Sequence, residues 1–284
     1  MELSGFKSRR NGIKIGAYLV SAFFILIACS APKNLSYSIN QYNQSLADSL
    51  LAYALDHEAL YTLADTLKPM SSVKFLSYAI AKDSSMQDGE AYVTHKDSLL
   101  QLIDQYQAVC KALSNDTWQF ILVPFQRTEK NMRNLEIYVI RKAVFADKIK
   151  QYQFFFGQWG FTPNTDPAVV LSVIEFETRW DRNRAYGYLF GYPAYAVDFF
   201  VEANKMQQAD VNKKIVPRNF FAIPVFAGSQ GYFTYAMPKS YQPNELDSAI
   251  YRKAENTLNQ YRQLRSSYLR PSGLKAQALW KQLR

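Results

Sequence analysis

Hydrophobic side chains recur at alternating spacings of three and four residues along three segments, a pattern typical of helices that bury one face. The first segment predicts a helix capped by Ser45 and Asp48 and ended by Pro69. Its apolar positions are Leu46, Leu50, Tyr53, His57, Leu60, Ala64 and Leu67. The second stripe comprises Leu99, Ile103, Tyr106, Cys110 and Leu113, and the third Leu246, Ile250, Ala254, Leu258, Tyr261, Leu264 and Tyr268. The second helix is expected to start near Thr94 or Asp97, and the third to end at Pro271.

Two pairs of apolar runs, each separated by a polar segment, predict β-hairpins. The first pair is 118–125 and 135–140, and the second is 219–226 and 231–237. Pro124 and Pro224 lie late in the first strand of each pair. Because proline lacks the amide hydrogen of a central ladder, these strand ends are expected at sheet edges or bulges. A further strand is predicted at 73–80.

Shorter patterns predict three more helices. One carries Phe145, Ile149, Tyr152 and Phe156 and closes at Gly157. Another starts at Asp166, which precedes Pro167, and runs to about Trp180, because Asp caps helices and Pro suits their first turn. The third opens at Pro193. Together these elements predict one α+β domain over residues 45–284, with a mostly antiparallel, hairpin-built sheet covered by several helices.

The first 28 residues follow a different pattern. A basic stretch ends at Lys14, and the uncharged apolar run 15–28 leads to Cys29. As a helix this run would extend roughly 21 Å, short of the roughly 30 Å hydrocarbon core of a bilayer. Such a segment is typical of a secretion signal rather than a permanent membrane span.

The residues Leu26, Ile27, Ala28 and Cys29 resemble the lipobox of bacterial lipoproteins. The resemblance implies transfer of a diacylglyceryl group to the Cys29 sulfur and cleavage after Ala28. It covers the signal region alone. Ser30 in place of the Asp that retains many lipoproteins at the inner membrane favours the periplasmic face of the outer membrane. We therefore expect a signal peptide at 1–28 and a lipidated tether at 29–44 that holds the protein on a membrane.

Composition excludes a disordered chain, because 48% of the 284 residues are hydrophobic and 15% are aromatic. The formal charge is +9. Removing the four basic residues and one acidic residue before Cys29 leaves 29 basic and 23 acidic residues, or +6. These charges are spread along the chain, so no nucleic-acid partner is expected. Acylation of Cys29 would leave Cys110 alone, so no disulfide is expected within the chain.

His57 and Glu58 are weak catalytic candidates, because an imidazole flanked by carboxylates can act as a general base. The flanking carboxylates belong to Asp56 and Glu58, yet neighbouring residues on a helix point about 100° apart and cannot converge on one ion. His57 also lies on the apolar stripe, where a hydrogen-bonded core histidine is expected. With His95 as the one other histidine, the sequence predicts no metal site and no cofactor.

Ser229 is another weak catalytic candidate. The segment 227–231, AGSQG, resembles the alanine variant of the nucleophile elbow of some lipases. An elbow requires a strand before the serine and a helix after it. Here the serine lies between two predicted strands, where Gly-Ser-Gln-Gly is ordinary turn chemistry, so the pattern favours a hairpin turn.

A ligand site is predicted near Arg179, Arg182 and Arg184, which precede the aromatic run 186–195 with Tyr186 and Tyr192. Guanidinium groups beside aromatic faces bind phosphate, carboxylate or sugar. Gly187 and Gly191 permit close backbone approach, which favours a pocket here. The acidic side chains Glu175, Glu177 and Asp181 offer simple ion pairing as the other interpretation. Tyr232 and Tyr235 offer a further surface on which a sugar could stack.

Two functions remain open from the sequence. The first is a non-enzymatic envelope lipoprotein that binds a partner protein or an envelope polysaccharide, because the chain carries a lipid-anchor motif, many aromatic residues and no complete catalytic set. The second is a cell-envelope hydrolase whose catalytic residues are dispersed along the chain around His57. The sequence does not decide whether the protein is an enzyme.

Overall fold

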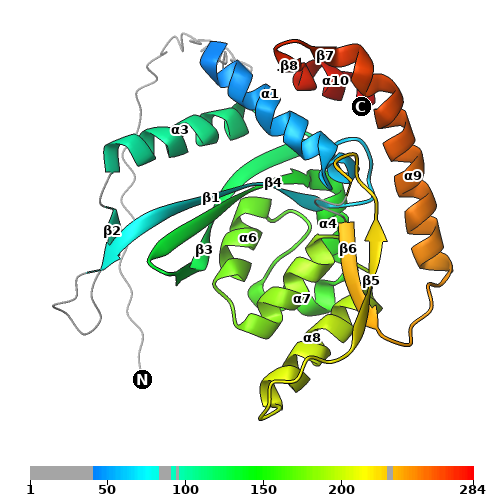
Figure 1. The fold of residues 1–284 in the computed structure, drawn as a ribbon. Coiled ribbons are helices and arrows are strands. Elements are labelled where there is room, and N and C mark those ends of the chain that lie inside the picture. The colour runs from blue at the N-terminus through cyan, green and yellow to red at the C-terminus, as the bar shows by residue number, and fades with distance from the viewer. Residues whose placement is uncertain (1–40, 83–90, 94–95, 229–232) are drawn as a thin grey trace, which may run out of the picture. The chain divides into compact units, whose positions relative to one another are not determined.

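The computed structural model of the protein describes residues 41–82, 91–93, 96–228 and 233–284 (Figure 1). The α-helices are α1 (Gln41–Asp56), α2 (Leu60–Leu63), α3 (Lys96–Leu113), α4 (Lys142–Gln151), α5 (Gln153–Phe156), α6 (Pro167–Glu175), α7 (Arg179–Leu189), α8 (Ala194–Ala209), α9 (Glu245–Arg265) and α10 (Ala276–Leu283). The 3-10 helices are η1 (Gly157–Trp159) and η2 (Ser266–Tyr268). The strands are β1 (Met70–Lys82), β2 (Ala91–Val93), β3 (Trp118–Glu129), β4 (Met132–Arg141), β5 (Arg218–Ile223), β6 (Phe233–Pro238), β7 (Leu269–Arg270) and β8 (Gly273–Leu274).

The predicted α+β domain with an antiparallel sheet is confirmed. Its main sheet has four strands in the order β2-β1-β4-β3, and β5-β6 and β7-β8 form separate two-stranded sheets. The β3–β4 hairpin is tighter than predicted, because both strands continue into the polar segment 126–134. Lys130 and Asn131 make its turn, with φ of 50° and 60°. Two consecutive residues with positive φ match the right-handed twist of a two-residue hairpin.

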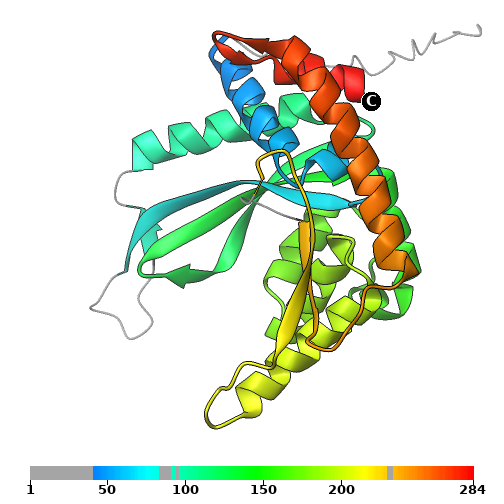
Figure 2. The same ribbon diagram turned by 45° about the vertical axis from the view of Figure 1, so that its right-hand side comes forward.

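Helices cover both faces of the main sheet. Figures 1 and 2 show α1 and α3 over one face and α4, α6 and α7 over the other. Strand β4 supplies both cores by alternation: Ile137 and Val139 join the core with α1, α3, α9 and α10, whereas Tyr138 and Ile140 join the core with α4 to α7. Glu136 belongs to the same alternating set as Tyr138 and Ile140, so it lies on the α7 side of the sheet.

Pro124 and Pro224 lie where no amide hydrogen is needed by a central strand, as predicted. Pro124 is on β3, an edge strand, at a register shift between Pro124 and Thr128. Pro224 directly follows the last residue of β5, Ile223. The helices predicted from the second apolar stripe and after Pro193 are confirmed as α3 and α8. The third apolar stripe forms α9, which ends at Arg265 and not at Pro271 as predicted, because η2 and β7 follow it. Among the described residues, no helix is both long enough and apolar enough to cross a membrane.

The predicted continuous helix from Ser45 to Pro69 is wrong, because α1 ends at Asp56 and the chain turns before α2. The backbone carbonyl of Asp56 accepts a hydrogen bond from the amide of Ala227 (2.8 Å), which gives the end of α1 a partner outside the helix. Ser45 is inside α1 and does not cap it, since α1 already includes residues 41–44, which were expected in the tether.

Two other helices differ from the prediction. Asp166 caps α6 as expected, with its Oδ1 accepting the Ala168 amide (2.7 Å). The helix nevertheless stops at Glu175 instead of about Trp180, and α7 starts after the break. The helix expected through Phe145 and Phe156 is divided at Tyr152 into α4 and α5, and α5 ends before Gly157 as predicted. The 3-10 helix η1 follows directly and ends at Gly160, whose φ of 72° is the left-handed conformation common at helix ends.

Candidate functional site

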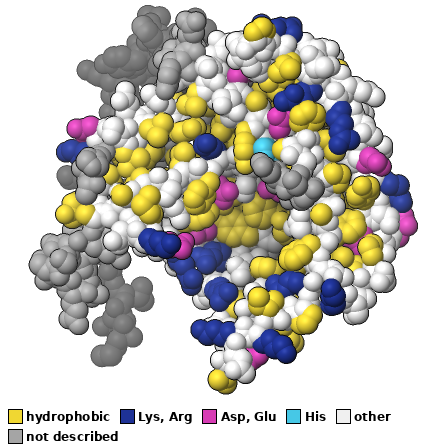
Figure 3. All heavy atoms as spheres, viewed as in Figure 1, with side chains coloured by type: hydrophobic (Ala, Val, Ile, Leu, Met, Phe, Trp, Pro, Cys, Tyr) yellow, Lys and Arg dark blue, Asp and Glu magenta, His cyan; other side chains and the backbone are white. Residues whose placement is uncertain are grey.

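Two adjoining cavities open on one face of the domain. The apolar cavity, about 310 Å³, lies among α7, α8, β5 and β6 and is lined by Asn183, Tyr186, Gly187, Phe190, Tyr192, Ala196, Val197, Phe200, Phe220, Thr234, Tyr235 and Ala236. The polar cavity, about 300 Å³, is lined by Tyr53, His57, Glu58, Ser72, Val73, Lys74, Phe75, Glu136 and Tyr192. The cavities share Tyr192, and we call the two together the cleft. Figure 3 shows a hollow on this face with an apolar floor and with acidic and basic side chains at its edges.

Gly187 lines the apolar cavity and Gly191 lies next to it in the chain segment where a pocket was predicted. A Cβ atom on Gly187 would lie 2.8 Å from Cγ2 of Val197, so its absence allows α7 to approach α8 closely. Gly191 has a φ of 82°, and a Cβ there would lie 2.8 Å from Cδ of Pro69. This turn after α7 places Tyr192 between the two cavities, with its ring centroid 5.7 Å from that of Phe233. Backbone positions that only glycine tolerates therefore build the junction of the cleft.

His57 is at the wall of the polar cavity and is only half-buried, so the expectation of a core histidine is wrong. Its Nδ1–H donates to the Tyr53 carbonyl oxygen over 2.8 Å, which leaves Nε2 as the second polar atom of the ring. The imidazole stacks on the Tyr53 ring with centroids 3.9 Å apart. The two rings therefore hold each other in a fixed orientation beside the cavity.

Glu58 pairs with Lys68 behind the cavity wall. The Lys68 Nζ lies 2.5 Å from Glu58 Oε2, and the lysine side chain is fully buried. The same ammonium group lies 4.4 Å, 5.1 Å and 5.7 Å from the ring centroids of Phe233, Phe190 and Tyr192. Burial lowers the pKa of Lys68, while the carboxylate of Glu58 opposes that change. The aromatic faces and the carboxylate together compensate a cation that has lost its hydration.

Glu136 is a cavity residue that the sequence analysis missed. Burial raises the pKa of Glu136; the hydroxyl groups of Tyr138 and Ser72 limit this rise, and the carboxylates of Glu58 and Glu175 add to it. No ion pair joins Glu136 to a basic side chain in the described parts of the chain. Glu136 is the one charged residue in the apolar run 135–140, and this is the sequence pattern that could have identified it.

Asp56, His57 and Glu58 have three separate partners, in agreement with the argument that they cannot converge. Asp56 receives two hydrogen bonds from Arg265, of 2.8 Å and 2.9 Å, and one from Tyr261, of 2.6 Å. These contacts join α1 to α9. Within the described ranges, no three His, Cys, Asp or Glu side chains are placed to hold a metal ion.

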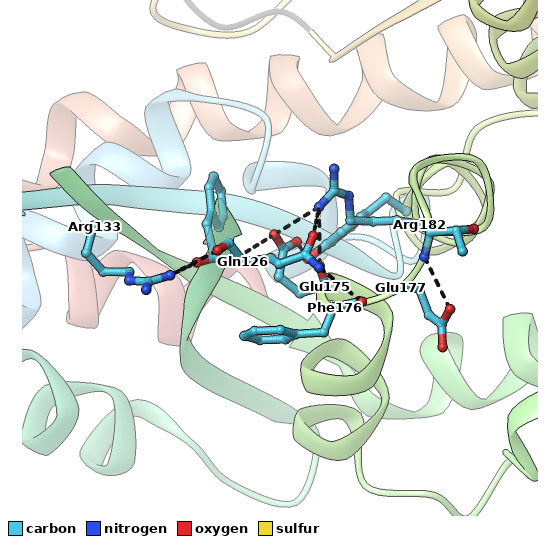
Figure 4. Close-up of polar contacts among 9 residues, drawn as sticks. Gln126, Arg133, Glu175, Phe176, Glu177 and Arg182 are labelled. Atoms are coloured by element: carbon cyan, nitrogen blue, oxygen red, sulfur yellow. Dashed lines mark hydrogen bonds and ion pairs between the residues drawn. The ribbon is translucent and has the colours of Figure 1, made fainter. Parts of the chain in front are cut away.

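The three predicted arginines do not converge on a ligand site, and two of them, Arg182 and Arg184, form ion pairs within the protein. Arg182 Nη1 donates to Gln126 Oε1 (3.1 Å) and to the Glu175 carbonyl (3.3 Å), and it lies 3.7 Å from Glu175 Oε1. Figure 4 shows these contacts, which tie α7 to the bulged part of β3 and to the break after α6. Arg133 Nη1 completes the cluster by donating to the Gln126 carbonyl over 3.1 Å.

The other two arginines point elsewhere. Arg184 binds Asp198 on α8 and donates to the Tyr188 hydroxyl over 3.1 Å. Arg179 is exposed, with its guanidinium 4.8 Å from the Trp180 ring centroid. The ion-pairing interpretation therefore holds for Arg182 and Arg184, although Arg184 uses a different acid from those expected. Of the five predicted ligand residues, the cleft brings together Tyr186 and Tyr192.

The remaining sequence candidates do not add to the cleft. Cys29, Ser229 and Tyr232 lie outside the described residues. Strand β6 rather than a helix follows Ser229, so the strand and helix order of a nucleophile elbow is absent from this hairpin. Tyr235 is buried and donates to Asp247 over 2.5 Å, and it lines the apolar cavity instead of an exposed sugar-stacking surface.

Glu175 connects the apolar cavity to the arginine cluster. Its Oε2 accepts from the hydroxyl of Tyr186 over 2.8 Å, and its Oε1 accepts from the amide of Gln126 over 3.1 Å. A buried carboxylate with these donors fixes the Tyr186 ring at the cavity wall.

Comparison of the chain with models of protein families, with curated proteins and with solved structures found no match.

Proposed function

We propose that the mature protein is a membrane-tethered, non-enzymatic envelope lipoprotein that holds part of a partner protein or an envelope polymer in the cleft. The observation that supports this most directly is the junction of an apolar and a polar cavity at Tyr192. Binding sites typically combine apolar walls with a few polar groups that orient the ligand. The cleft has both, and its aromatic walls are fixed by packing and hydrogen bonds.

The contacts of the candidate catalytic groups support binding over chemistry. Nucleophilic catalysis requires a nucleophile hydrogen-bonded to a base. His57 uses Nδ1 on a backbone carbonyl, and Glu58 pairs with a buried lysine. Both groups are therefore occupied with protein partners, and neither is hydrogen-bonded to a serine or cysteine side chain among the described residues.

A photo-crosslinking experiment in intact cells tests the cleft. Phe220 lines the apolar cavity and is 64% exposed, so p-benzoylphenylalanine there should react with whatever occupies the cleft. Phe154 is 80% exposed on α5, away from the cavity lining, and provides the matched control. We expect one defined product from position 220 and none from position 154. Equal labelling from both positions, or no labelling from position 220, would contradict the proposal.

The lipid anchor requires its own test, because it rests on the resemblance of residues 26–29 to a lipobox. Cells grown with radiolabelled palmitate should incorporate label into the protein, and a Cys29→Ala variant should not. Two or three acyl chains stabilise membrane attachment by about 0.8 kcal/mol per buried methylene, so the labelled form should fractionate with the outer membrane. An unlabelled protein would overturn the tether and leave the cleft untouched.

A cell-envelope hydrolase is the second candidate, and one observation favours it. Glu58 and Glu136 line the same cavity in different surroundings, one paired with a lysine and the other without a basic partner. A carboxylate and a carboxylic acid on two sides of a glycosidic bond are the groups that hydrolyse it. Release of reducing ends from cell-wall glycans, abolished by Glu136→Gln and by Glu58→Gln, would establish this function in place of the first.

A further inference from the structure

The polar cavity is large enough to hold one small polar unit of a larger ligand. Its volume of about 300 Å³ is enough for about ten non-hydrogen atoms at roughly 30 Å³ each, the volume of a water molecule in the liquid. This is close to one monosaccharide unit. The adjoining apolar cavity, about 310 Å³, can receive a substituent of similar size.

Two half-exposed aromatic rings line the polar cavity. Tyr53 is 49% exposed and Phe75 is 50% exposed, large values for aromatic side chains. Neither ring is loose, because Tyr53 stacks on His57 and Phe75 packs edge-on against Phe125 with centroids 5.8 Å apart. Rings that are already ordered lose little conformational entropy on binding. They offer flat apolar faces to the C–H groups of a ligand that also carries hydroxyls.

The polar groups of the cavity suit a ligand that both donates and accepts hydrogen bonds. Glu58, Glu136, Ser72 and His57 line the cavity and carry carboxyl, hydroxyl and imidazole groups. Each hydroxyl of a saccharide is one donor and an acceptor, so neighbouring hydroxyls can use carboxyl oxygens and an imidazole at once. Carboxylates that bind vicinal hydroxyls need no positive charge on the ligand.

The charges of the cavity favour a neutral ligand over an ammonium or a phosphate. Lys68 compensates Glu58 at 2.5 Å, so that carboxylate has no need of a ligand cation. Glu136 lies in surroundings where burial favours its neutral form. Lys74 adds one positive charge to the lining, which disfavours a cation without creating the cluster of basic groups that a phosphate requires.

We infer that the polar cavity binds one neutral monosaccharide unit of a glycan, stacked against Phe75 and Tyr53, with an acyl or other apolar substituent directed into the cavity beyond Tyr192. This inference rests on the proposed function and narrows its ligand to a saccharide. It assigns Phe75 as the stacking residue and Ser72, Glu58 and Glu136 as the groups that orient the hydroxyls.

Saturation-transfer NMR on the protein purified from cells in detergent tests the inference. The probes are linear tetrasaccharides of N-acetylglucosamine, glucose and mannose, with tetramethylammonium and inorganic phosphate as charged probes. We expect transfer to the ring protons of at least one tetrasaccharide and none to tetramethylammonium. Binding of tetramethylammonium or phosphate in place of every saccharide would overturn the inference.

Matched variants locate the saccharide. Phe75→Ala should weaken binding about tenfold, as expected when a ring that contributes about 1.4 kcal/mol is removed, whereas Phe75→Trp should retain it. Phe154→Ala, which removes an exposed ring outside the cleft, should leave the affinity unchanged. Equal affinity of Phe75→Ala and the unmodified protein would overturn the assignment of the polar cavity.

The crosslinking and NMR results together test the proposed function and the saccharide ligand separately. Crosslinks from position 220 without saccharide binding would leave the cleft as a binding site and refute the saccharide. Absence of both would refute the proposed function as well. Transfer to a tetrasaccharide that Phe75→Ala binds about tenfold more weakly, together with crosslinks from position 220, supports both.

Discussion

Two carboxyl groups withdrawn from water have opposite surroundings in this protein. Asp247, fully buried at the start of α9, accepts hydrogen bonds from the hydroxyls of Tyr195, Tyr235 and Tyr241 and from the amide of Asn244. Burial alone would favour its neutral form, but these donors outweigh burial and lower the pKa of Asp247. Glu136, in the cleft, has a pKa that burial raises, because the two nearby hydroxyls do not outweigh it.

The difference separates a structural carboxylate from one that is suited to a ligand. Asp247 belongs to a capping box with Asn244, and its tyrosine donors come from α8, β6 and the segment before α9. It therefore joins three parts of the fold with every oxygen satisfied. Glu136 contributes no comparable links and lines a cavity. A half-buried acid whose two hydroxyl donors do not offset burial is costly unless something else supplies further donors, which is why it indicates a binding site.

The largest loss of stability is expected when the hydrogen-bonded carboxylate of Asp247 is removed. Asp247→Ala leaves three tyrosine hydroxyls and one backbone amide without their acceptor, and each buried unsatisfied group costs about 1–3 kcal/mol. We expect urea unfolding to show a loss of at least about 3 kcal/mol. Glu136→Gln is the comparison, with a loss below about 1 kcal/mol. Similar losses for the two variants would remove the distinction between them.

Lys68→Met tests whether the cleft also contains a structural charge. The substitution leaves Glu58 without its partner beside three aromatic rings, and breaking such a pair is expected to cost about 2–3 kcal/mol, since Glu58 is partly exposed to solvent. The double variant Lys68→Met/Glu58→Gln should recover most of that loss, because no unpaired charge remains. Denaturant unfolding of both variants checks this. A double variant as unstable as the single one would show that packing, and not charge, is responsible.

The pH dependence of stability should have opposite signs at the two carboxyls. The lowered pKa of Asp247 contributes stability that is present above its unfolded value, about 3.9, and is lost as the pH falls below it. The raised pKa of Glu136 means that the folded protein binds the extra proton, so stability falls as the pH rises above the unfolded value of about 4.3. Urea unfolding from about pH 3 to 8 should show that Glu136→Gln flattens the fall at higher pH while Asp247→Asn flattens the fall at acidic pH.

The smallest effect is expected for His57→Ala. The ring is half-buried and makes one hydrogen bond and one ring contact, so its removal should cost about 0.5–1 kcal/mol in a thermal or urea melt. The variant should also weaken saccharide binding if the imidazole faces the ligand. A loss of stability above about 2 kcal/mol would show that His57 packs as part of the hydrophobic core and does not belong to the cleft.

Local signals predicted the elements of the fold that depend on local chemistry. Asp166 and Pro167 marked the start of α6, Pro193 preceded α8, and the long apolar stripe gave α9. Pro124 indicated the irregular part of an edge strand. Each of these features depends on the residue itself, through a missing amide, a fixed φ or a capping oxygen, and is therefore visible in sequence.

The breaks in helices and most of the cleft depend on distant contacts. The stripe through His57 continues without interruption in sequence, yet the chain turns there, and its neighbours Asp56 and Glu58 contact α9 and Lys68 instead. No sequence pattern indicated that Lys68 is buried, because its aromatic partners lie far along the chain, in the segment after α7 and in β6. Tyr186 and Tyr192 were predicted from the arginine-rich and aromatic segment with its two glycines. The place of Glu136 in the cleft instead depends on the packing of β4 with β1, the end of α1 and Tyr192.

The contact between α1 and α10 constrains the order in which this domain can be completed. The Asp48 side chain accepts the Gln277 amide over 2.8 Å and so caps α10, whose Leu279 and Trp280 are buried in the core beneath α1. The ring of Trp280 lies 5.1 Å from that of Trp118 and its indole donates to the Leu63 carbonyl over 3.3 Å. A nascent chain therefore cannot complete the core with α1, α3, α9 and α10 until residues 276–283 have been synthesised. Helix α1 therefore completes its packing only after α10 has been synthesised, whereas the core with α4 to α7 contains no residue of α10.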